Sequence, residues 1–277
     1  MSLILALAAG VLWGSADYGG GRLAWRLPAV TVVFASQAAA LLALGVLVVA
    51  RGEAALPVGG YLLFGVAAGV VGSAALVAFY RALATGPMGL VAPLAATGVV
   101  IPVTVGVLRG DRLTAFQGAG IALAVCGAIL ASGPDLRSGV PVRRRTVLLA
   151  ATAAVGFGAV LPLIAEGART SVLGTLVVQR SANVIVMGAI LLVLGLRAAV
   201  DRAALPALVC VGLADVTANG AYALATRSGL VSVVSVLASL YPIWTALLAR
   251  YLLGERLRPI QTAGVGAALG GVLLVAT

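Results

Sequence analysis

The hydrophobic positions of the chain fall into long runs that short polar gaps separate. Each run is roughly twenty residues long, about the length that an α-helix needs to cross the hydrocarbon core of a bilayer. The pattern therefore predicts an all-α membrane protein with ten transmembrane helices. We expect them near residues 2–18, 28–50, 58–80, 88–108, 113–132, 147–165, 172–196, 205–226, 229–250 and 258–276.

A series of short motifs occurs twice in the same order, namely A-L-A-T, G-L-V, a proline and G-[DE]-R-L-x-x-x-Q-x-x-G. The motifs begin at Ala82, Gly89, Pro102 and Gly110 in the first copy and at Ala223, Gly229, Pro242 and Gly254 in the second. The second copy carries four extra residues before its last motif, about one helical turn, so the helix faces keep their directions. The chain is therefore two halves of one design.

Ten spans in two copies give five spans per copy, and an odd unit leaves the membrane on the side opposite its entry. The second copy must then lie upside down relative to the first, an arrangement typical of alternating access. We expect a first repeat over 1–132, a linker over 133–146 and a second repeat over 147–277, because the linker is the one long polar segment.

Composition supports lipid as the solvent. Hydrophobic residues make up 62% of the chain and charged residues 9%, and the mean hydropathy is +1.17. The net charge of +10 is carried by arginines, seventeen of which lie in or beside the gaps between runs, as residues that set topology do. Nucleic acid is not an expected partner. By the positive-inside rule, the larger number of arginines opposite the N-terminus favours both termini outside the cell.

Several chemistries are not expected. Histidine is absent, and Cys126 and Cys210 each stand alone in an apolar run, so we predict no catalytic residue, no metal site and no cofactor. No phosphate-binding glycine loop of the ATPase type is present. The functional site must be built from the spans themselves.

The doubled motif, with Tyr80, Ala82 and Leu83 before Pro102, resembles that of the EamA-type transporters of the drug/metabolite transporter superfamily. The resemblance implies a ten-helix, inverted-repeat carrier in the plasma membrane, bacterial in type. It implies export of amino acids, metabolites or drugs, or sugar-phosphate exchange, often driven by protons, through a cavity lined by helices 1, 3, 4, 6, 8 and 9. This chain departs from the family at Asp111, where glutamate is usual, and in a fourth helix one turn shorter.

Asp215 lies deep in the eighth run, and a carboxylate in hydrocarbon costs about 2.5–3.5 kcal/mol by insertion scales. It should therefore face a cavity or a partner, or carry a proton, and we expect it to couple transport to protons. Asn219 and Tyr222 share its helical face, which predicts a cavity wall. The alternative is a structural polar group satisfied by a neighbouring helix.

Arg180 is the one arginine inside a run. Either it forms a buried pair with Asp215, which would be largely architectural, or it binds an anionic group of the solute. The matching region of the second run has Ser36 and Gln37, so the predicted cavity is charged in one half only. This asymmetry hints at a zwitterionic or anionic solute.

Further candidates for solute binding are Trp13, Thr97, Ser235 and Ser239. Ser235 and Ser239 belong to one polar face of the ninth run, where helix packing is the competing interpretation. Asp17 is close enough to the end of the first run that a solvated loop position is favoured. Asp111 should cap a helix rather than touch solute.

The leading prediction is a secondary transporter that exports small metabolites, such as amino acids or drug-like solutes, by alternating access with proton coupling. One alternative is an uncoupled facilitator or channel, and another is a membrane-embedded enzyme acting on a lipid-linked substrate. The enzyme is disfavoured because the eight acidic residues are scattered. The partners expected are the solute, protons and the bilayer. The G-x-x-x-G from Gly266 to Gly270 suggests internal packing or a homodimer, so monomer and homodimer both stay open.

Overall fold

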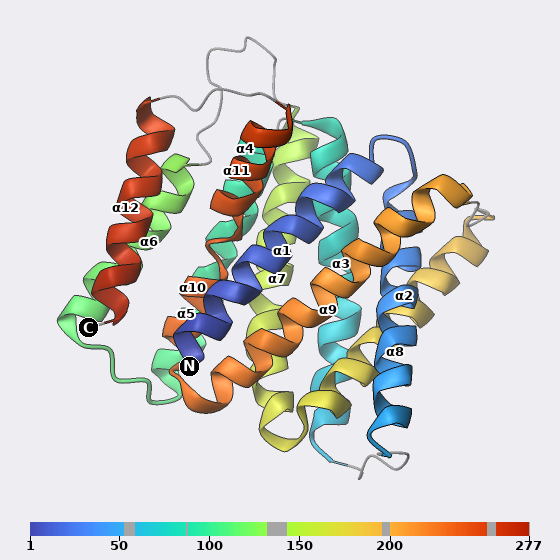
Figure 1. Ribbon diagram of the computed structural model, residues 1–277, viewed down its shortest axis with the longest axis horizontal. Helices are drawn as coiled ribbons and strands as arrows, with labels where there is room; N and C mark the ends of the chain where they lie inside the picture. The colour runs from blue at the N-terminus through green and yellow to red at the C-terminus, as the bar shows by residue number, and fades with distance from the viewer. Residues whose placement is uncertain (53–58, 87, 132–142, 196–199, 254–258, 277) are drawn as a thin grey trace.

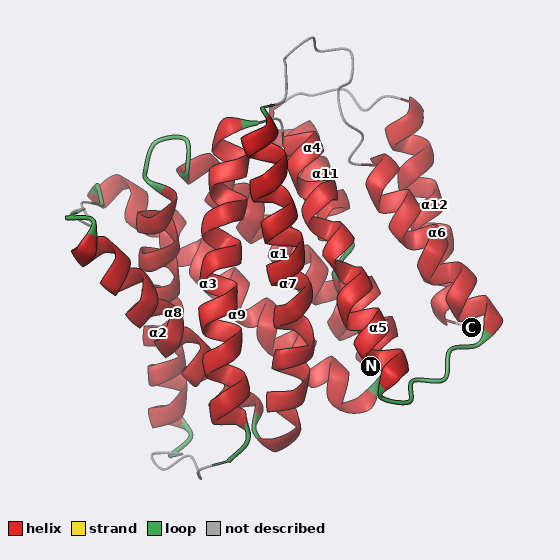
Figure 2. Cartoon of the chain, turned by 180° about the vertical axis from the view of Figure 1, so that it is seen from behind, coloured by secondary structure: helices red, strands yellow, loops and turns green. Residues whose placement is uncertain are grey.

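The computed structural model describes residues 1–52, 59–86, 88–131, 143–195, 200–253 and 259–276. Within these ranges the chain is helical and holds no strand, which confirms the predicted all-α class (Figure 2). The helices are α1 (Ser2–Leu23), α2 (Ala29–Ala50), α3 (Tyr61–Thr85), α4 (Met88–Ala96), η1 (Thr97–Val99), α5 (Val100–Leu108), α6 (Ala115–Ala131), α7 (Arg144–Thr170), α8 (Val172–Val193), η2 (Arg202–Ala204), α9 (Leu205–Ser228), α10 (Val231–Ala238), α11 (Tyr241–Leu253) and α12 (Pro259–Ala276).

Six helices in the described residues are long and apolar enough to cross a membrane: α1, α2, α3, α7, α8 and α9, the last together with η2. Four further apolar helical stretches are shorter, over 94–108, 115–130, 231–245 and 262–275. Large apolar side chains on the outer faces of the bundle are exposed, among them Leu42, Ile185, Leu192 and Leu273. An exterior of this kind suits lipid rather than water.

The fourth and ninth apolar runs are broken helices. The fourth is interrupted by the 3₁₀ turn η1, and the ninth by a turn between α10 and α11. Each interruption comes shortly before a proline, Pro102 or Pro242, whose ring nitrogen cannot donate to the carbonyl four residues earlier. Proline therefore accounts for a break in each of the two runs.

Two glycines allow the backbones of α1 and α7 to approach these breaks. A Cβ on Gly14 would lie 2.7 Å from the carbonyl oxygen of Tyr241, and one on Gly158 would overlap the carbonyl of Gly98. No residue with a side chain fits at such distances. The neighbouring Trp13 and Phe157 are thereby held beside the two breaks.

The helices pair in a regular way (Figure 1). In the main bundle α1 packs along α9, α3 packs along α7, and α2 packs on α8 and α9. The start of α1 and the end of α12 lie at the same end of the bundle. Every long helix turns one face toward the interior of the bundle. Polar side chains near the middle of these faces therefore lie close together.

At one edge of the bundle α6 and α12 pack on each other (Figures 1 and 2). The close approach is made at Gly120, where a Cβ would lie 2.8 Å from the carbonyl oxygen of Gly271. Gly266 has open space around it. A Cβ on Gly270 would lie 3.7 Å from Leu123 Cδ2 on α6, so of the two glycines in the G-x-x-x-G motif it is Gly270 that faces the helix pair.

Candidate functional site

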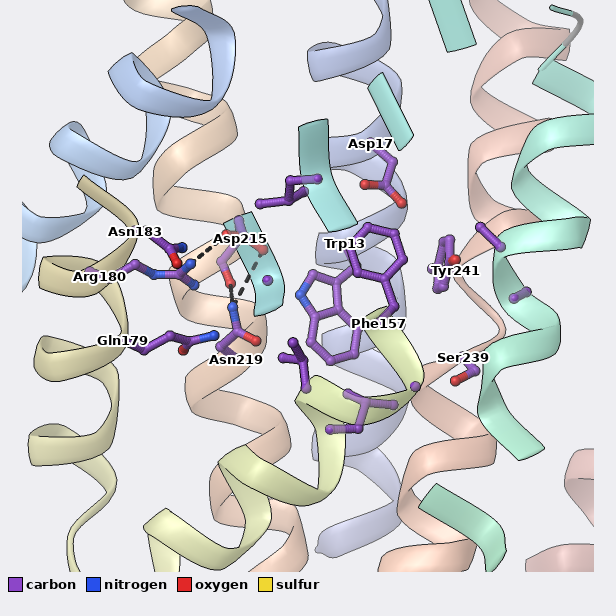
Figure 3. Close-up of a pocket in the computed structure, with 17 residues that line it drawn as sticks. Trp13, Asp17, Phe157, Gln179, Arg180, Asn183, Asp215, Asn219, Ser239 and Tyr241 are labelled. Atoms are coloured by element: carbon purple, nitrogen blue, oxygen red, sulfur yellow. Dashed lines mark hydrogen bonds and ion pairs between the residues drawn. The ribbon is translucent and has the colours of Figure 1, made fainter. Parts of the chain in front are cut away.

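A cavity of about 80 Å³ lies inside the bundle, roughly halfway along the helices that surround it (Figure 3). Its walls come from α1, α3, α4, α7, α8, α9, the turn between α10 and α11, and the first residue of α11. The polar and aromatic residues that line it are Trp13, Asp17, Phe157, Gln179, Arg180, Asn183, Asp215, Asn219, Ser239 and Tyr241. The resemblance implied helices 1, 3, 4, 6, 8 and 9, and the seventh run contributes here as well.

Arg180 and Asp215 form an ion pair at one side of this cavity. Arg180 Nη1 donates to Asp215 Oδ2 at 3.0 Å, and the arginine side chain is 1% exposed. Gln37 on α2 joins them, since its Nε2 donates to the same carboxylate oxygen at 3.0 Å and its Oε1 accepts from Arg180. The two charges compensate each other, as intramembrane charges generally do. Of the two interpretations of Arg180, the pair with Asp215 is present.

Neighbouring amides hold this cluster in place. Asn219, one turn after Asp215 on α9, donates through Nδ2 to the Asp215 carbonyl at 3.0 Å and to its Oδ1 at 3.4 Å. The amide of Asn183 lies 3.2 Å from Gln37 Oε1 and 3.1 Å from Ser73 Oγ. Arg180 Nε and Nη2 are buried and have no hydrogen-bond partner among the described residues. The guanidinium therefore keeps unused donors beside the cavity.

The structure contradicts the sequence-based prediction for Asp17. Asp17 was expected near a helix end in a solvated position, but α1 continues to Leu23 and Asp17 is only 8% exposed. The reason is that Gly20 packs directly against the ring of Tyr80, so the glycine-rich stretch extends the helix instead of ending it. In the part of the chain that the structure describes, Asp17 has no hydrogen-bond or ion-pair partner, and it lines the cavity.

Aromatic rings form much of the remaining wall. In Figure 3 the ring of Trp13 lies between the Asp215 cluster and Tyr241. The hydroxyl of Tyr241 is buried, and no residue within the described ranges is hydrogen-bonded to it. Trp13 also contacts Tyr222, with ring centroids 5.8 Å apart.

The structure brings together five of the predicted site residues around the cavity: Trp13, Arg180, Asp215, Asn219 and Ser239. The other three, Thr97, Tyr222 and Ser235, do not line it. The Thr97 hydroxyl donates to the Leu94 carbonyl at 2.7 Å. Tyr222 is completely buried, and its hydroxyl is hydrogen-bonded to Ser235 at 2.9 Å.

Sequence reasoning missed Asp17, Phe157 and Tyr241 as cavity residues. A signal for Asp17 was present, because it follows Trp13 by four residues and so shares its helical face. No comparable signal marks Tyr241, which the break before α11 turns toward the cavity.

A second cavity, of about 390 Å³, lies where α5, α7 and α9 end. We call it the arginine-lined cavity, after Arg109, Arg169 and Arg227. Arg109 from the first half pairs with Glu166 from the second, and Arg169 approaches the same carboxylate oxygen at 3.5 Å.

Asp111, also in this cavity, joins the two halves. Its Oδ2 accepts from the backbone nitrogen of Ser232 at 2.9 Å and from the Ser232 hydroxyl at 2.8 Å. Ser232 lies in the first turn of α10, so Asp111 satisfies a free N–H at that helix start. The prediction that Asp111 caps a helix is confirmed.

Comparison with known proteins agrees with these features. A family model, described as the EamA-like transporter family, matches the chain twice, over residues 1–133 and 144–277. The chain belongs to this family. It is therefore an integral, multi-pass membrane transporter, and the suspected resemblance is confirmed. The two EamA matches follow the two halves that the sequence motifs define.

Among solved structures, a crystal structure described only as that of a protein is similar to this chain. The two share 18% sequence identity, with a TM-score of 0.78 over 100% of this chain and 96% of the other. At this identity the likeness bears on the fold alone. No curated protein matches the chain.

Proposed function

We propose that this EamA-family protein is a secondary transporter that exports small metabolites across the plasma membrane by alternating access. The observation that carries the proposal is the Arg180–Asp215 pair, which faces a polar cavity midway along apolar helices. Charged groups at such a depth are costly and mark solute or ion pathways.

The proposed architecture has ten spans in two inverted repeats, over 1–132 and 147–277. It is supported by the way the helices pair. The first run packs on the eighth, and correspondingly the sixth packs on the third. The first run also packs on the broken ninth, and correspondingly the sixth packs on the broken fourth. A two-fold axis in the membrane plane exchanges the members of each set.

The size of the central cavity fits a closed state in the transport cycle. About 80 Å³ is smaller than the roughly 300–1,000 Å³ of ordinary ligand pockets, so a metabolite requires the walls to separate. Tyr222 and Ser235 lie between this cavity and the arginine-lined cavity along α9 and α10. We assign their hydrogen bond to the barrier that must open toward that end.

Asp215 is the proposed proton-coupling residue. A proton on its carboxylate would neutralise one member of the ion pair and leave the Arg180 guanidinium without its counter-ion. The changed charge would then favour different arrangements of α8 and α9 in the protonated and deprotonated states. Coupling of this kind requires both a titrating group and a cavity that each side of the membrane can reach.

The test is solute flux in proteoliposomes containing the purified protein, with a panel of amino acids and drug-like amines, with and without a pH gradient. We expect flux that responds to the gradient in the wild type and at least a tenfold loss of the response in Asp215→Asn. Asp201→Asn is the matched control, because Asp201 is exposed at the start of η2.

Two results would contradict parts of the proposal. Gradient-dependent flux in Asp215→Asn equal to that of the wild type would remove Asp215 as the proton carrier. Flux in the wild type that ignores the gradient would indicate an uncoupled facilitator.

A further inference from the structure

We infer that Asp17 recognises a cationic ammonium group on the transported solute. The inference rests on the proposed function and names the chemical class of the solute. It starts from one unusual feature, a buried carboxylate at the cavity wall with no partner among the described residues.

The absence of a partner sets Asp17 apart from the neighbouring acid. Asp215 is held by Arg180, Gln37 and Asn219. Asp17 is 8% exposed and receives no hydrogen bond from the part of the chain that the structure describes. A buried ionised carboxylate is unfavourable unless something pairs with it. Without a positive charge beside it, such a carboxyl group is neutralised by a proton. A cationic group that enters from the cavity would supply that charge.

The charges that line the cavity decide the sign of that partner. The charged residues in the lining are Asp17, Arg180 and Asp215. Arg180 and Asp215 form an ion pair, which leaves Asp17 as the one acid of the lining whose charge, when it is ionised, no described cation offsets. A positively charged group restores neutrality, whereas an anion would add to the excess. The charge balance of the lining therefore argues against an anionic solute, which the charge asymmetry of the sequence had suggested.

The aromatic lining also favours a cation. Trp13 lies one helical turn before Asp17 on the same face of α1, and Phe157 and Tyr241 complete the wall around it (Figure 3). Ring faces attract ammonium groups electrostatically. The buried hydroxyl of Tyr241 lacks a partner and offers an additional oxygen acceptor.

The position of Asp17 links recognition to movement. Asp17 lies three residues after Gly14, where α1 contacts the backbone of Tyr241 just after the break in the ninth run. A cation bound between Asp17 and the aromatic residues therefore contacts both α1 and α11. Its arrival changes the electrostatics at the junction that must move if the cavity is to open.

Binding can be tested with three probes of matched shape and different charge: benzylamine, benzyl alcohol and benzoate. Trp13 supplies the signal, through its fluorescence in purified protein that carries Trp25→Phe and Trp244→Phe. We expect benzylamine to bind at least tenfold more tightly than benzyl alcohol, and benzoate to bind most weakly. In Asp17→Asn the preference for benzylamine should disappear while affinity for benzyl alcohol stays within about twofold.

Two further variants keep the test independent of folding. Asp17→Glu retains the charge and should restore the preference for the amine, and Asp201→Asn should leave it unchanged. A preference for benzylamine that persists in Asp17→Asn, or equal affinities for the three probes in the wild type, would overturn the inference. These affinities need no flux, so a protein that transports solutes without selecting amines would refute Asp17 recognition and leave the proposed function standing.

Discussion

At the scale of single residues, the centre of the molecule holds opposite charges that compensate each other inside an apolar bundle. Arg180 and Gln37 occupy corresponding positions in the two halves and contact each other, and Asp215 is bonded to both. Arg180 contacts both Asp215 and Gln37 through Nη1 and carries the one positive charge of the cluster, so its removal affects the cluster more than the loss of any single amide would. The pair holds α2, α8 and α9 together as well as lining the cavity.

Removing one member of the pair should cost more than removing both. Arg180→Leu leaves the Asp215 carboxylate buried without its cation, a change worth up to about 3–5 kcal/mol in folded proteins. We expect a lower unfolding temperature for Arg180→Leu, measured in detergent, and recovery of most of the loss in Arg180→Leu/Asp215→Leu. A double variant as unstable as the sum of the two single variants would show that the pair does not couple these residues.

The candidate site was partly predictable at this scale, for a physical reason. Asp215 and Arg180 are visible in the sequence because charged residues inside apolar runs are expensive and therefore rare. Asp17 is also buried, but the glycines that follow it resemble a helix end. Tyr222 shares the face of Asp215, yet a helical face several turns long crosses both a cavity and a packed layer, and the sequence does not mark where one becomes the other.

At the scale of helices, the same arrangement occurs on each side of the cavity: a broken helix contacts a glycine of a neighbouring unbroken helix. On one side α1 contacts the break between α10 and α11, and on the other α7 contacts η1. The sequence carries a signal for both breaks, because Pro102 and Pro242 follow them closely. It did not predict their partners, because a helix that is apolar around most of its surface does not indicate which face packs against which neighbour.

Gly14→Ala should disturb this contact selectively. Its new Cβ would lie 2.7 Å from the Tyr241 carbonyl oxygen, so α1 and α11 must separate. We expect a loss of stability of about 1–3 kcal/mol, as for overpacked cores, and altered fluorescence of Trp13. Gly45→Ala is the control, since nothing lies within 4 Å of its Cβ and alanine favours the helix. Equal unfolding temperatures for Gly14→Ala and the wild type would show that the close approach does not constrain α1.

At the scale of the whole molecule, the two halves contact each other through charged groups at one end, through the hydrogen bonds of Gln37 at the central cluster, and through helix packing. Both the Arg109–Glu166 pair and the Asp111–Ser232 hydrogen bonds cross from the first half to the second at the arginine-lined cavity. The motif repeat predicted two related halves, and the family matches over 1–133 and 144–277 agree with it. The contacts between the halves could not be predicted, because Arg109 and Glu166 are far apart in sequence and carry no shared motif.

The Arg109–Glu166 pair should restrain the opening of this end of the molecule. Glu166→Gln removes the acceptor shared by Arg109 and Arg169, and leaves Asp111 as the one carboxylate facing the three arginines that line the cavity. Their mutual repulsion would then favour separation of α5, α7 and α9.

The reporter is Thr226→Cys, at the wall of the cavity, in a background with Cys126→Ser and Cys210→Ser. We expect a membrane-impermeant maleimide to label it severalfold faster in Glu166→Gln than with the pair intact, and exchange of the charges in Arg109→Glu/Glu166→Arg to return the rate toward the original. Labelling at the same rate in all three backgrounds would mean that this ion pair stabilises the surface without holding the two halves closed.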